Sequence, residues 1–301
     1  MTFYIIIYTL LFNINYDIRI ESRLSEFTRY FLDSDYFVYY NFVDRYYHIQ
    51  NSTKNENYEF RFEPGNGEFE SDFYGEYIVS DGIIYHYDFP KMKVITYNLS
   101  TKELNENALS HAFDYMYPFE NESLKKVGLF SRTAVHEGIL NKQELTDIDV
   151  NVQSNNYLEL KEFNMFLGFN DIFINKNKTK FFVNKYYPII IKYENTIEII
   201  PVDKKFKKDE IKKDPNKSQK PPDISTFRNS SSYIHDDKIY LTYNGIYKGK
   251  SYKTNELFIF DTMTETINQV KINHYVTAFI KNDLGKVLIV DSTNTIQELT
   301  L

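Results

Sequence analysis

Two segments of the chain place arginine, histidine and carboxylate side chains within a few residues of one another. In each, an arginine follows a phenylalanine in a Ser- or Asn-rich stretch that leads into an expected strand. A guanidinium in such a loop can hold a carboxylate or phosphate through two parallel hydrogen bonds. Alternatively, the arginines brace neighbouring turns through backbone carbonyls, and the histidine of the second segment belongs only to a turn. The predicted ligand-binding residues are Arg132, His136, Glu137, Arg228, His235 and Asp236.

No catalytic, metal-binding or cofactor-binding motif is present in the sequence. It contains no His-Glu-x-x-His, P-loop, Gly-x-Gly-x-x-Gly or Gly-x-Ser-x-Gly pattern. The six histidines are scattered, and no two have the spacing of metal ligands on one element. We therefore predict no catalytic residue, no metal ligand and no cofactor, although residues from separate strands of a circular fold would escape a linear search.

Composition limits the classes of partner. The 301 residues include 42% hydrophobic and 26% charged residues, enough for a sizeable core, and a net charge of −7 argues against nucleic acid. The absence of cysteine removes disulfides and a lipid-bearing cysteine. The 27 tyrosines and 25 phenylalanines fit either an AT-rich codon bias or aromatic ligand platforms.

Short apolar or alternating runs bounded by turn residues recur along the chain, which is typical of β-strands. No segment shows a long helical period. The spacing indicates an all-β protein. The expected strands are residues 36–40, 77–80, 83–87, 94–97, 180–183, 189–193, 239–243, 257–260, 275–280 and 287–290.

A weak internal repeat organises these strands. Residues 94–104 and 257–267 both have a strand, a polar turn and the start of a return strand, with Asn98 or Asp261 opening the turn. A short polar side chain at that position can bond the backbone two residues further on. Residues 80–85 and 235–240 share a turn followed by a strand that ends in tyrosine. The repeated unit predicts a four-stranded propeller blade.

Two segments fall outside the repeat. Residues 1–15 fit either a degenerate signal segment or a buried strand, since the apolar run from Phe3 to Phe12 is too short to span a membrane and no basic residue precedes it. Residues 203–223 are rich in lysine and proline, with Phe206 and Ile211 as the only large apolar residues. We expect this second segment to be an inserted, solvated loop, with a docking patch for an anionic partner as the alternative.

The carboxy-terminal third resembles the last blades of Bacteroidetes six-bladed β-propeller proteins, the TolB-like propeller lipoproteins and relatives of unknown function. The similar segments are residues 238–245, 255–261, 275–279 and 285–288. Residues 180–194 are similar to middle blades of that family, and residues 64–69 to its inter-blade turn. The resemblance implies a propeller of the cell envelope and supplies no catalytic residues. The lipid-bearing cysteine and a recognisable first blade are missing.

Together these features predict a single all-β domain over residues 16–301, a six-bladed β-propeller with four-stranded antiparallel blades. The last unit, from about residue 275, has room for three strands. We therefore expect an amino-terminal strand at 16–21 to pair with the final strands and close the ring.

The predicted function is non-enzymatic binding of a protein, small molecule or carbohydrate on one propeller face, in the cell envelope and without a transmembrane span. One alternative is a hydrolase or lactonase with acids and a metal at the channel mouth. The other is a structural scaffold in a larger complex, and a cytoplasmic location also stays open.

Overall fold

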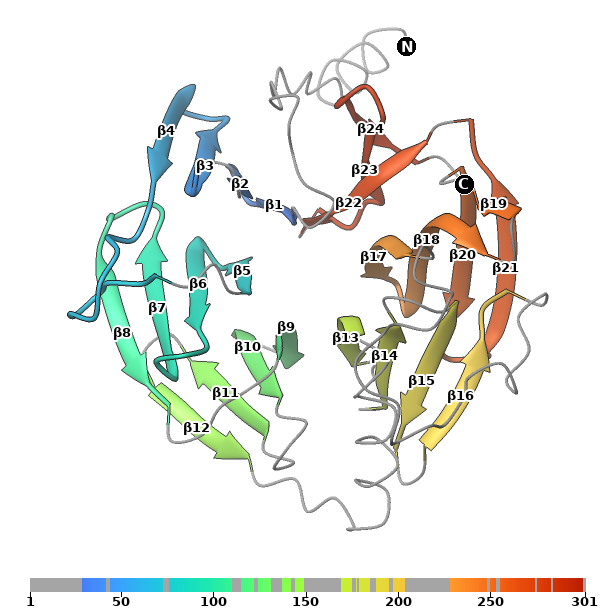
Figure 1. Ribbon diagram of the computed structural model, residues 1–301, viewed down its shortest axis with the longest axis horizontal. Coiled ribbons are helices and arrows are strands. Elements are labelled where there is room, and N and C mark those ends of the chain that lie inside the picture. The colour runs from blue at the N-terminus through green and yellow to red at the C-terminus, as the bar shows by residue number, and fades with distance from the viewer. Residues whose placement is uncertain are drawn as a thin grey trace, which may run out of the picture.

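Among the residues that it describes, the computed structural model contains 24 β-strands and no helix. Its strands form sheets arranged around a common centre (Figure 1). Residues 1–28 and 204–227, which include the expected closing strand and nearly all of the lysine-rich segment, lie outside the described residues. The described residues are 29–41, 44–72, 76–109, 115–121, 124–130, 137–141, 144–148, 169–174, 177, 179–184, 188–194, 197–203, 228–247, 250–252, 255–273, 275–282 and 284–299.

Each group of consecutive strands is an antiparallel meander whose first strand lies nearest the centre. The first group contains β1 (Tyr30–Asp33), β2 (Tyr36–Asn41), β3 (Tyr46–Asn51) and β4 (Glu56–Phe60). The second contains β5 (Tyr77–Ser80), β6 (Ile83–Asp88), β7 (Lys93–Asn98) and β8 (Leu104–Ala108). The third contains β9 (Tyr115–Asn121), β10 (Leu124–Phe130), β11 (Glu137–Asn141) and β12 (Glu144–Ile148).

The remaining strands fall into three further groups. The fourth contains β13 (Phe169–Ile174), β14 (Lys180–Asn184), β15 (Ile189–Tyr193) and β16 (Ile197–Pro201). The fifth contains β17 (Arg228–His235), β18 (Lys238–Tyr247), β19 (Lys250–Tyr252), β20 (Glu256–Asp261) and β21 (Thr266–Lys271). The last contains β22 (Val276–Asn282), β23 (Leu288–Asp291) and β24 (Ile296–Glu298). Such radial meanders are the architecture of a β-propeller.

The first and last groups join into one seven-stranded sheet. Strands β1 and β22 pair in parallel, with Tyr30 opposite Ile280 and Leu32 opposite Asn282. All other strand pairs among the described residues are antiparallel. The two ends of the described chain therefore meet through their innermost strands.

All ten strands expected from the sequence are confirmed within about two residues, apart from the longer carboxy-terminal end of β18. The expected turn chemistry is also confirmed. Asn98 Oδ1 accepts the backbone N–H of Ser100 at 2.9 Å, and Asp261 Oδ1 accepts that of Met263 at 2.9 Å. Hydrogen bonds from the backbone N–H groups of Thr264, chiefly, and of Met263 hold the pKa of Asp261 below its ordinary value.

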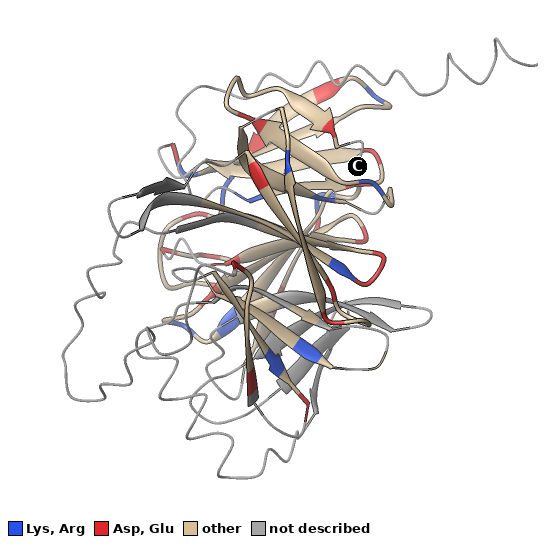
Figure 2. Ribbon diagram, turned by 90° about the vertical axis from the view of Figure 1, so that its right-hand side faces the viewer, with Lys and Arg blue, Asp and Glu red and all other residues tan. Residues whose placement is uncertain are grey.

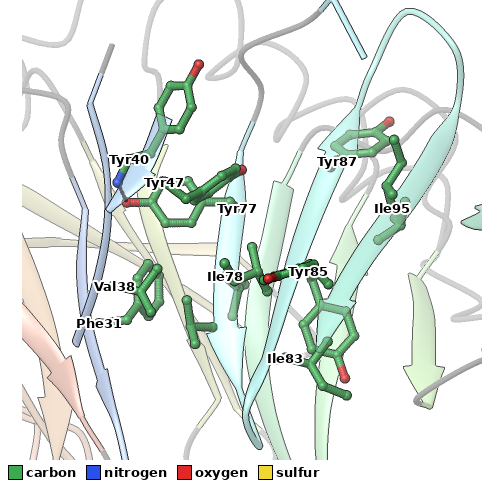
Figure 3. Packing of buried hydrophobic residues seen from close by; sticks show 14 of the residues in the cluster. Phe31, Val38, Tyr40, Tyr47, Tyr77, Ile78, Ile83, Tyr85, Tyr87 and Ile95 are labelled. Atoms are coloured by element: carbon green, nitrogen blue, oxygen red, sulfur yellow. Dashed lines mark hydrogen bonds between the residues drawn. The ribbon is translucent and has the colours of Figure 1, made fainter. Parts of the chain in front are cut away.

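The buried core consists largely of aromatic and β-branched side chains between neighbouring sheets. Figure 3 shows Tyr47 of β3 against Tyr77 of β5, whose ring centroids are 5.2 Å apart at 83°. An inner strand such as β6 is buried at every residue, because both faces of its sheet are covered, whereas the outer strand β4 is mostly exposed. Complete burial of one large apolar side chain stabilises the folded state by roughly 1.5–3 kcal/mol. Figure 2 shows Lys, Arg, Asp and Glu positions in many of the turns and also along some strands.

The strand ends define two faces. The innermost strands β1, β5 and β9 begin together, since Glu76, just before β5, contacts both Arg29 and Met116. The ends of β17 and β22 also lie together, since the Tyr233 hydroxyl donates to the Asn282 carbonyl at 3.1 Å. We call the side where the innermost strands begin the entry face and the opposite side the exit face.

Candidate functional site

The predicted ligand-binding residues do not gather on one face. Glu137 begins β11 opposite Phe130, and Arg228 begins β17 opposite Asn244, so both backbones lie at the entry face, in different sheets. His235 ends β17 and Asp236 follows it, which places both at the exit face. The two other residues of the set, Arg132 and His136, lie outside the described part of the chain.

His235 and Asp236 form a small exit-face cluster with their neighbours. The His235 Nε2 atom lies 3.3 Å from Asp236 Oδ2, and the imidazole stacks on the Tyr233 ring at 6.4 Å between centroids. A Cβ built on Gly285 would lie 3.5 Å from the same imidazole, which shows how closely the β22–β23 turn approaches it. Asp236 is exposed and His235 is half-buried. These contacts hold the turn that follows β17, and the Asp236 carboxylate faces solvent.

The best-defined polar site lies elsewhere, under the loop that joins β4 to β5. Lys91, in the β6–β7 turn, donates through Nζ to the carbonyl of Gly65 and, at 3.3 Å, to that of Glu70. Glu70 folds back and accepts the N–H of Gly67 at 2.6 Å. Gly65 has a φ of 143°, which L-amino acids with a Cβ rarely adopt. The loop, similar in sequence to an inter-blade turn, does connect two sheets.

A second lysine also holds the β4–β5 loop through a hydrogen bond. Lys93 of β7 is buried, donates to the carbonyl of Gly67 at 3.1 Å and lies 2.7 Å from Glu106 Oε2. The same Glu106 oxygen accepts the N–H of Phe69 at 2.8 Å. Phe69 has a φ of 58°, an unfavourable conformation for a bulky residue. The hydrogen bond to Glu106 offsets part of that strain.

Beneath the loop, four buried polar side chains form a continuous chain of hydrogen bonds. The Tyr47 hydroxyl lies 2.7 Å from His86 Nδ1, and the Ser71 hydroxyl lies 3.0 Å from His86 Nε2. Ser71 in turn donates to Asp88 Oδ2 at 2.7 Å. The four residues come from β3, the inter-sheet loop and β6, so the network joins the first two sheets. We call it the Tyr47–Asp88 network.

The direction of the protons in the Tyr47–Asp88 network follows from counting donors. A serine hydroxyl has one proton, which Ser71 gives to Asp88, so the Ser71 oxygen must accept from His86 Nε2–H. A neutral His86 then accepts the Tyr47 proton at Nδ1. The network therefore contains serine, histidine and aspartate in an order opposite to that of a hydrolase, where histidine takes the serine proton.

Burial excludes the serine of the Tyr47–Asp88 network as a nucleophile in this conformation. Ser71 is 6% exposed and its proton points to a carboxylate, away from a base. The sequence held one signal for this network. His86 and Asp88 are two residues apart on one strand and so lie on the same face of the sheet. Tyr47 and Ser71 are too distant along the chain for any spacing rule to find them.

Glu76 lies at the entry face, where the innermost strands begin. Its Oε1 lies 3.2 Å from Arg29 Nη2, and its Oε2 accepts the N–H of Met116 at 2.8 Å. Next to it, the Tyr77 hydroxyl accepts the N–H of Tyr40 at 2.9 Å and donates to the carbonyl of Arg29. The sequence pattern did not indicate a role for Arg29, which lies directly before the innermost strand β1.

Burial dominates the titration behaviour of the core tyrosines. It raises the pKa of Tyr30, Tyr47, Tyr77 and Tyr243 well above the ordinary value. Burial, with the charges of Asp81 and Asp33, raises the pKa of Tyr85 to about 12. These phenols are neutral structural groups near neutral pH.

Within the described ranges, no three His, Cys, Asp or Glu side chains gather closely enough to hold a metal ion. No helix among the described residues has the length and apolarity needed to cross a lipid bilayer.

Exposed apolar side chains occur on both faces. Phe89 and Met92 lie on the β6–β7 turn at the entry face and are 44% and 43% exposed. Tyr275, just before β22, lies on the same face and is 46% exposed. The carbonyl of Met92 accepts the N–H of Leu109 at 2.7 Å, and Lys91 ties the turn to the neighbouring loop. Phe89 and Met92 are therefore displayed on a firmly held turn.

No protein-family model matches the sequence, and neither does any curated protein. Among solved structures, the chain is similar to virginiamycin B lyase from Staphylococcus aureus (12% identity, 92% of this chain and 85% of that one, TM-score 0.46). It is also similar to a putative exported protein from Bacteroides fragilis (10% identity, 91% and 82%, TM-score 0.49). A third is the β-propeller domain of Cps50 (Swd1) from Myceliophteria thermophila (10% identity, 94% and 99%, TM-score 0.48). Similarities this low say nothing about ligand or activity.

Proposed function

We propose that this chain is a six-bladed β-propeller that binds a ligand or partner at its entry face without catalysing a reaction, and that it works in the cell envelope. The envelope location rests on the sequence resemblance to Bacteroidetes propellers. The blade count rests on the pairing pattern. The seven-stranded sheet divides at its parallel pair into β1–β4 and β22–β24, which adds two blades to the four other sheets.

The binding role is supported by a contrast between the polar side chains, which are buried, and the apolar side chains that are exposed on the entry face. The polar groups of the Tyr47–Asp88 network and the lysines beneath the β4–β5 loop form hydrogen bonds inside the protein. The network also joins the first two sheets. The entry face meanwhile holds Phe89 and Met92 in solvent on a turn that hydrogen bonds anchor. Apolar groups preorganised on a rigid turn lose little entropy when a partner covers them.

An array of envelope polysaccharides, peptidoglycan fragments and peptides, probed with the labelled full chain, tests the binding role. The double variant Phe89→Ser, Met92→Ser should lose most of the signal for the bound ligand. Leu284→Ser, which removes a 41% exposed side chain from the exit face, should retain it. Equal signals for the two variants would exclude the Phe89–Met92 turn as the binding surface.

The ring closure has its own test. We propose that residues 16–21 add to the outer edge of β24 and complete the last blade, which has three strands among the described residues. Because the chain has no cysteine, single cysteines placed at 16–21 and at Ile296–Glu298 can form only the intended disulfides. Cross-linking across this edge is the expected result, and a complete failure across all pairs would refute the closure.

A further inference from the structure

The turn between β6 and β7 is rigid, and it displays its apolar side chains in a strained conformation. The Met92 N–H donates to the Phe89 carbonyl at 3.2 Å, which closes a β-turn with Pro90 at its second position. Proline favours that position because its ring fixes φ near the value that the turn needs. Met92 has a φ of 48°, in the left-handed region that residues with a Cβ rarely adopt. Glycine would relieve this strain but would remove the exposed apolar side chain.

Carboxylates line this turn on the side of the β4–β5 loop. Residues 63–72 contain four acidic residues and no basic residue. Three of the acidic side chains, Glu63, Glu68 and Asp72, are exposed. The loop lies against the turn, because Lys91 Nζ is 3.9 Å from Asp72 Oδ2 and donates to two carbonyls of the loop. The exposed apolar side chains and the exposed carboxylates therefore belong to one surface of the entry face.

The cations of this region leave an excess of negative charge at the surface. The side chain of Lys91 is 19% exposed and that of Lys93 is 7% exposed, and both ammonium groups donate to carbonyls beneath the loop. Arg61, just after β4, is exposed and lies 3.9 Å from Glu63 and 5.2 Å from the centroid of the Tyr46 ring. One exposed guanidinium thus stands against three exposed carboxylates.

We propose that the β6–β7 turn and the β4–β5 loop together bind a polypeptide segment in which lysine or arginine flanks apolar side chains. The apolar side chains of the segment pack on Phe89 and Met92, and its cations pair with Glu63, Glu68 and Asp72. Aromatic residues and methionine are enriched in protein interfaces, and methionine adapts to the shape of its partner.

Charge selects the class of partner. The three exposed carboxylates, on a chain with a net charge of −7, repel acidic polysaccharides, anionic lipids and nucleic acids. A basic, amphipathic polypeptide matches both the charge and the apolar side chains of this surface. This inference rests on the proposed function for its choice of surface and names the class of ligand.

Selection of a random peptide library, displayed on phage, against the immobilised full chain tests the inference. Enriched peptides should carry lysine or arginine on both sides of aromatic or aliphatic residues. A labelled synthetic peptide of the enriched sequence then reports affinity by fluorescence anisotropy, and the affinity should fall as salt rises. The triple variant Glu63→Gln, Glu68→Gln, Asp72→Asn should weaken binding about tenfold, because three exposed ion pairs of small individual strength are lost together.

The matched control is the triple variant Asp35→Asn, Glu103→Gln, Glu194→Gln. It removes the same number of exposed carboxylates from three turns of the exit face and should bind the peptide as the unaltered chain does. Both triple variants change the net charge equally and keep the side chains similar in size. A difference in affinity between them therefore locates the charges that contact the peptide, and circular dichroism checks that both variants are folded.

The outcomes separate the inference from the proposed function. No enrichment, enrichment of acidic or uncharged peptides, or equal binding by the two triple variants would each overturn the inference. If the Phe89→Ser, Met92→Ser variant still loses an array ligand in that case, the proposed function stands without it. If this double variant retains both the selected peptide and every array ligand, the proposed function and the inference are both wrong.

Discussion

The Glu76 carboxylate and the Arg29 guanidinium lie 3.2 Å apart, although the two residues are separated by 47 positions in the sequence. The second oxygen of the same carboxylate accepts the N–H of Met116. One side chain thus holds together the starting ends of β1, β5 and β9, which belong to three different sheets. Long-range contacts of this kind determine which sheets are neighbours.

Replacing Glu76 with alanine should lower the free energy of unfolding by about 1–3 kcal/mol, because the half-buried Arg29 and the Met116 N–H both lose their contact with the carboxylate. Glu76→Gln keeps an acceptor for Met116 and should cost less. Urea denaturation followed by circular dichroism measures both. The control is Glu63→Gln, whose contact with Arg61 is 3.9 Å and exposed, and which should change stability little. An equal effect of Glu76→Ala and Glu63→Gln would show that Glu76 does not join the sheets energetically.

Ser71→Ala should lower the free energy of unfolding by about 1–3 kcal/mol, because the buried Asp88 carboxylate and the buried His86 Nε2–H each lose their hydrogen bond to the Ser71 hydroxyl. The matched control is Ser100→Ala, which removes an exposed hydroxyl from a turn and should stay within about 0.5 kcal/mol of the unaltered chain. Thermal and urea unfolding compare the two. A Ser71→Ala protein as stable as the control would mean that water or a rearrangement replaces the hydroxyl.

The order of donors in the Tyr47–Asp88 network predicts that His86 carries its proton on Nε2. Long-range ¹H–¹⁵N spectra of protein labelled at histidine distinguish the two tautomers, and a His86→Gln sample identifies the signal. A neutral His86 protonated at Nδ1 would contradict the order, because Ser71 would then have to donate to His86 and could not also donate to Asp88.

The buried tyrosines predict a loss of stability in alkali. Their pKa values are raised by burial, so the unfolded chain releases protons at a lower pH than the folded one. Their contribution is complete below the unfolded pKa of about 10 and declines as pH rises from there. Unfolding free energies between pH 8 and 12 should fall together with a cooperative rise in tyrosinate absorbance. Tyr85→Phe, which removes a phenol whose pKa is about 12, should reduce the loss, and Tyr275→Phe, at an exposed site, should not.

The β3–β4 turn predicts an ordering of substitutions at Asn55. This residue has a φ of 51°, in the left-handed region that asparagine and glycine tolerate. Asn55→Gly should keep or raise stability, whereas Asn55→Ala should lower it by about 1 kcal/mol. Glu56→Ala, at the neighbouring exposed position in β4, provides the control for side-chain loss alone. Equal stabilities of the glycine and alanine variants would show that this turn relaxes out of the left-handed region.

The all-β class and ten of the strands were predictable from the sequence, because apolar runs and turn residues are local signals. Asn98 and Asp261 illustrate this, since each turn closes on its own neighbours within three residues. The expected strands are mainly second and third strands, which are covered on both faces and are therefore largely apolar. The outer strand β4 was not predicted, because one edge and much of its surface face water and its sequence is polar.

The candidate site depended on tertiary structure. The predicted set treated Arg228 and His235 as parts of one loop, but strand β17 carries them to opposite faces. The Tyr47–Asp88 network combines residues from three segments, and the parallel pairing of β1 with β22 joins the first described strand to the last group of strands. Local periodicity determined where the chain forms strands. Only the packing of sheets around a common centre determined which polar side chains meet, since contacts between residues distant in the chain leave no periodic signal in it.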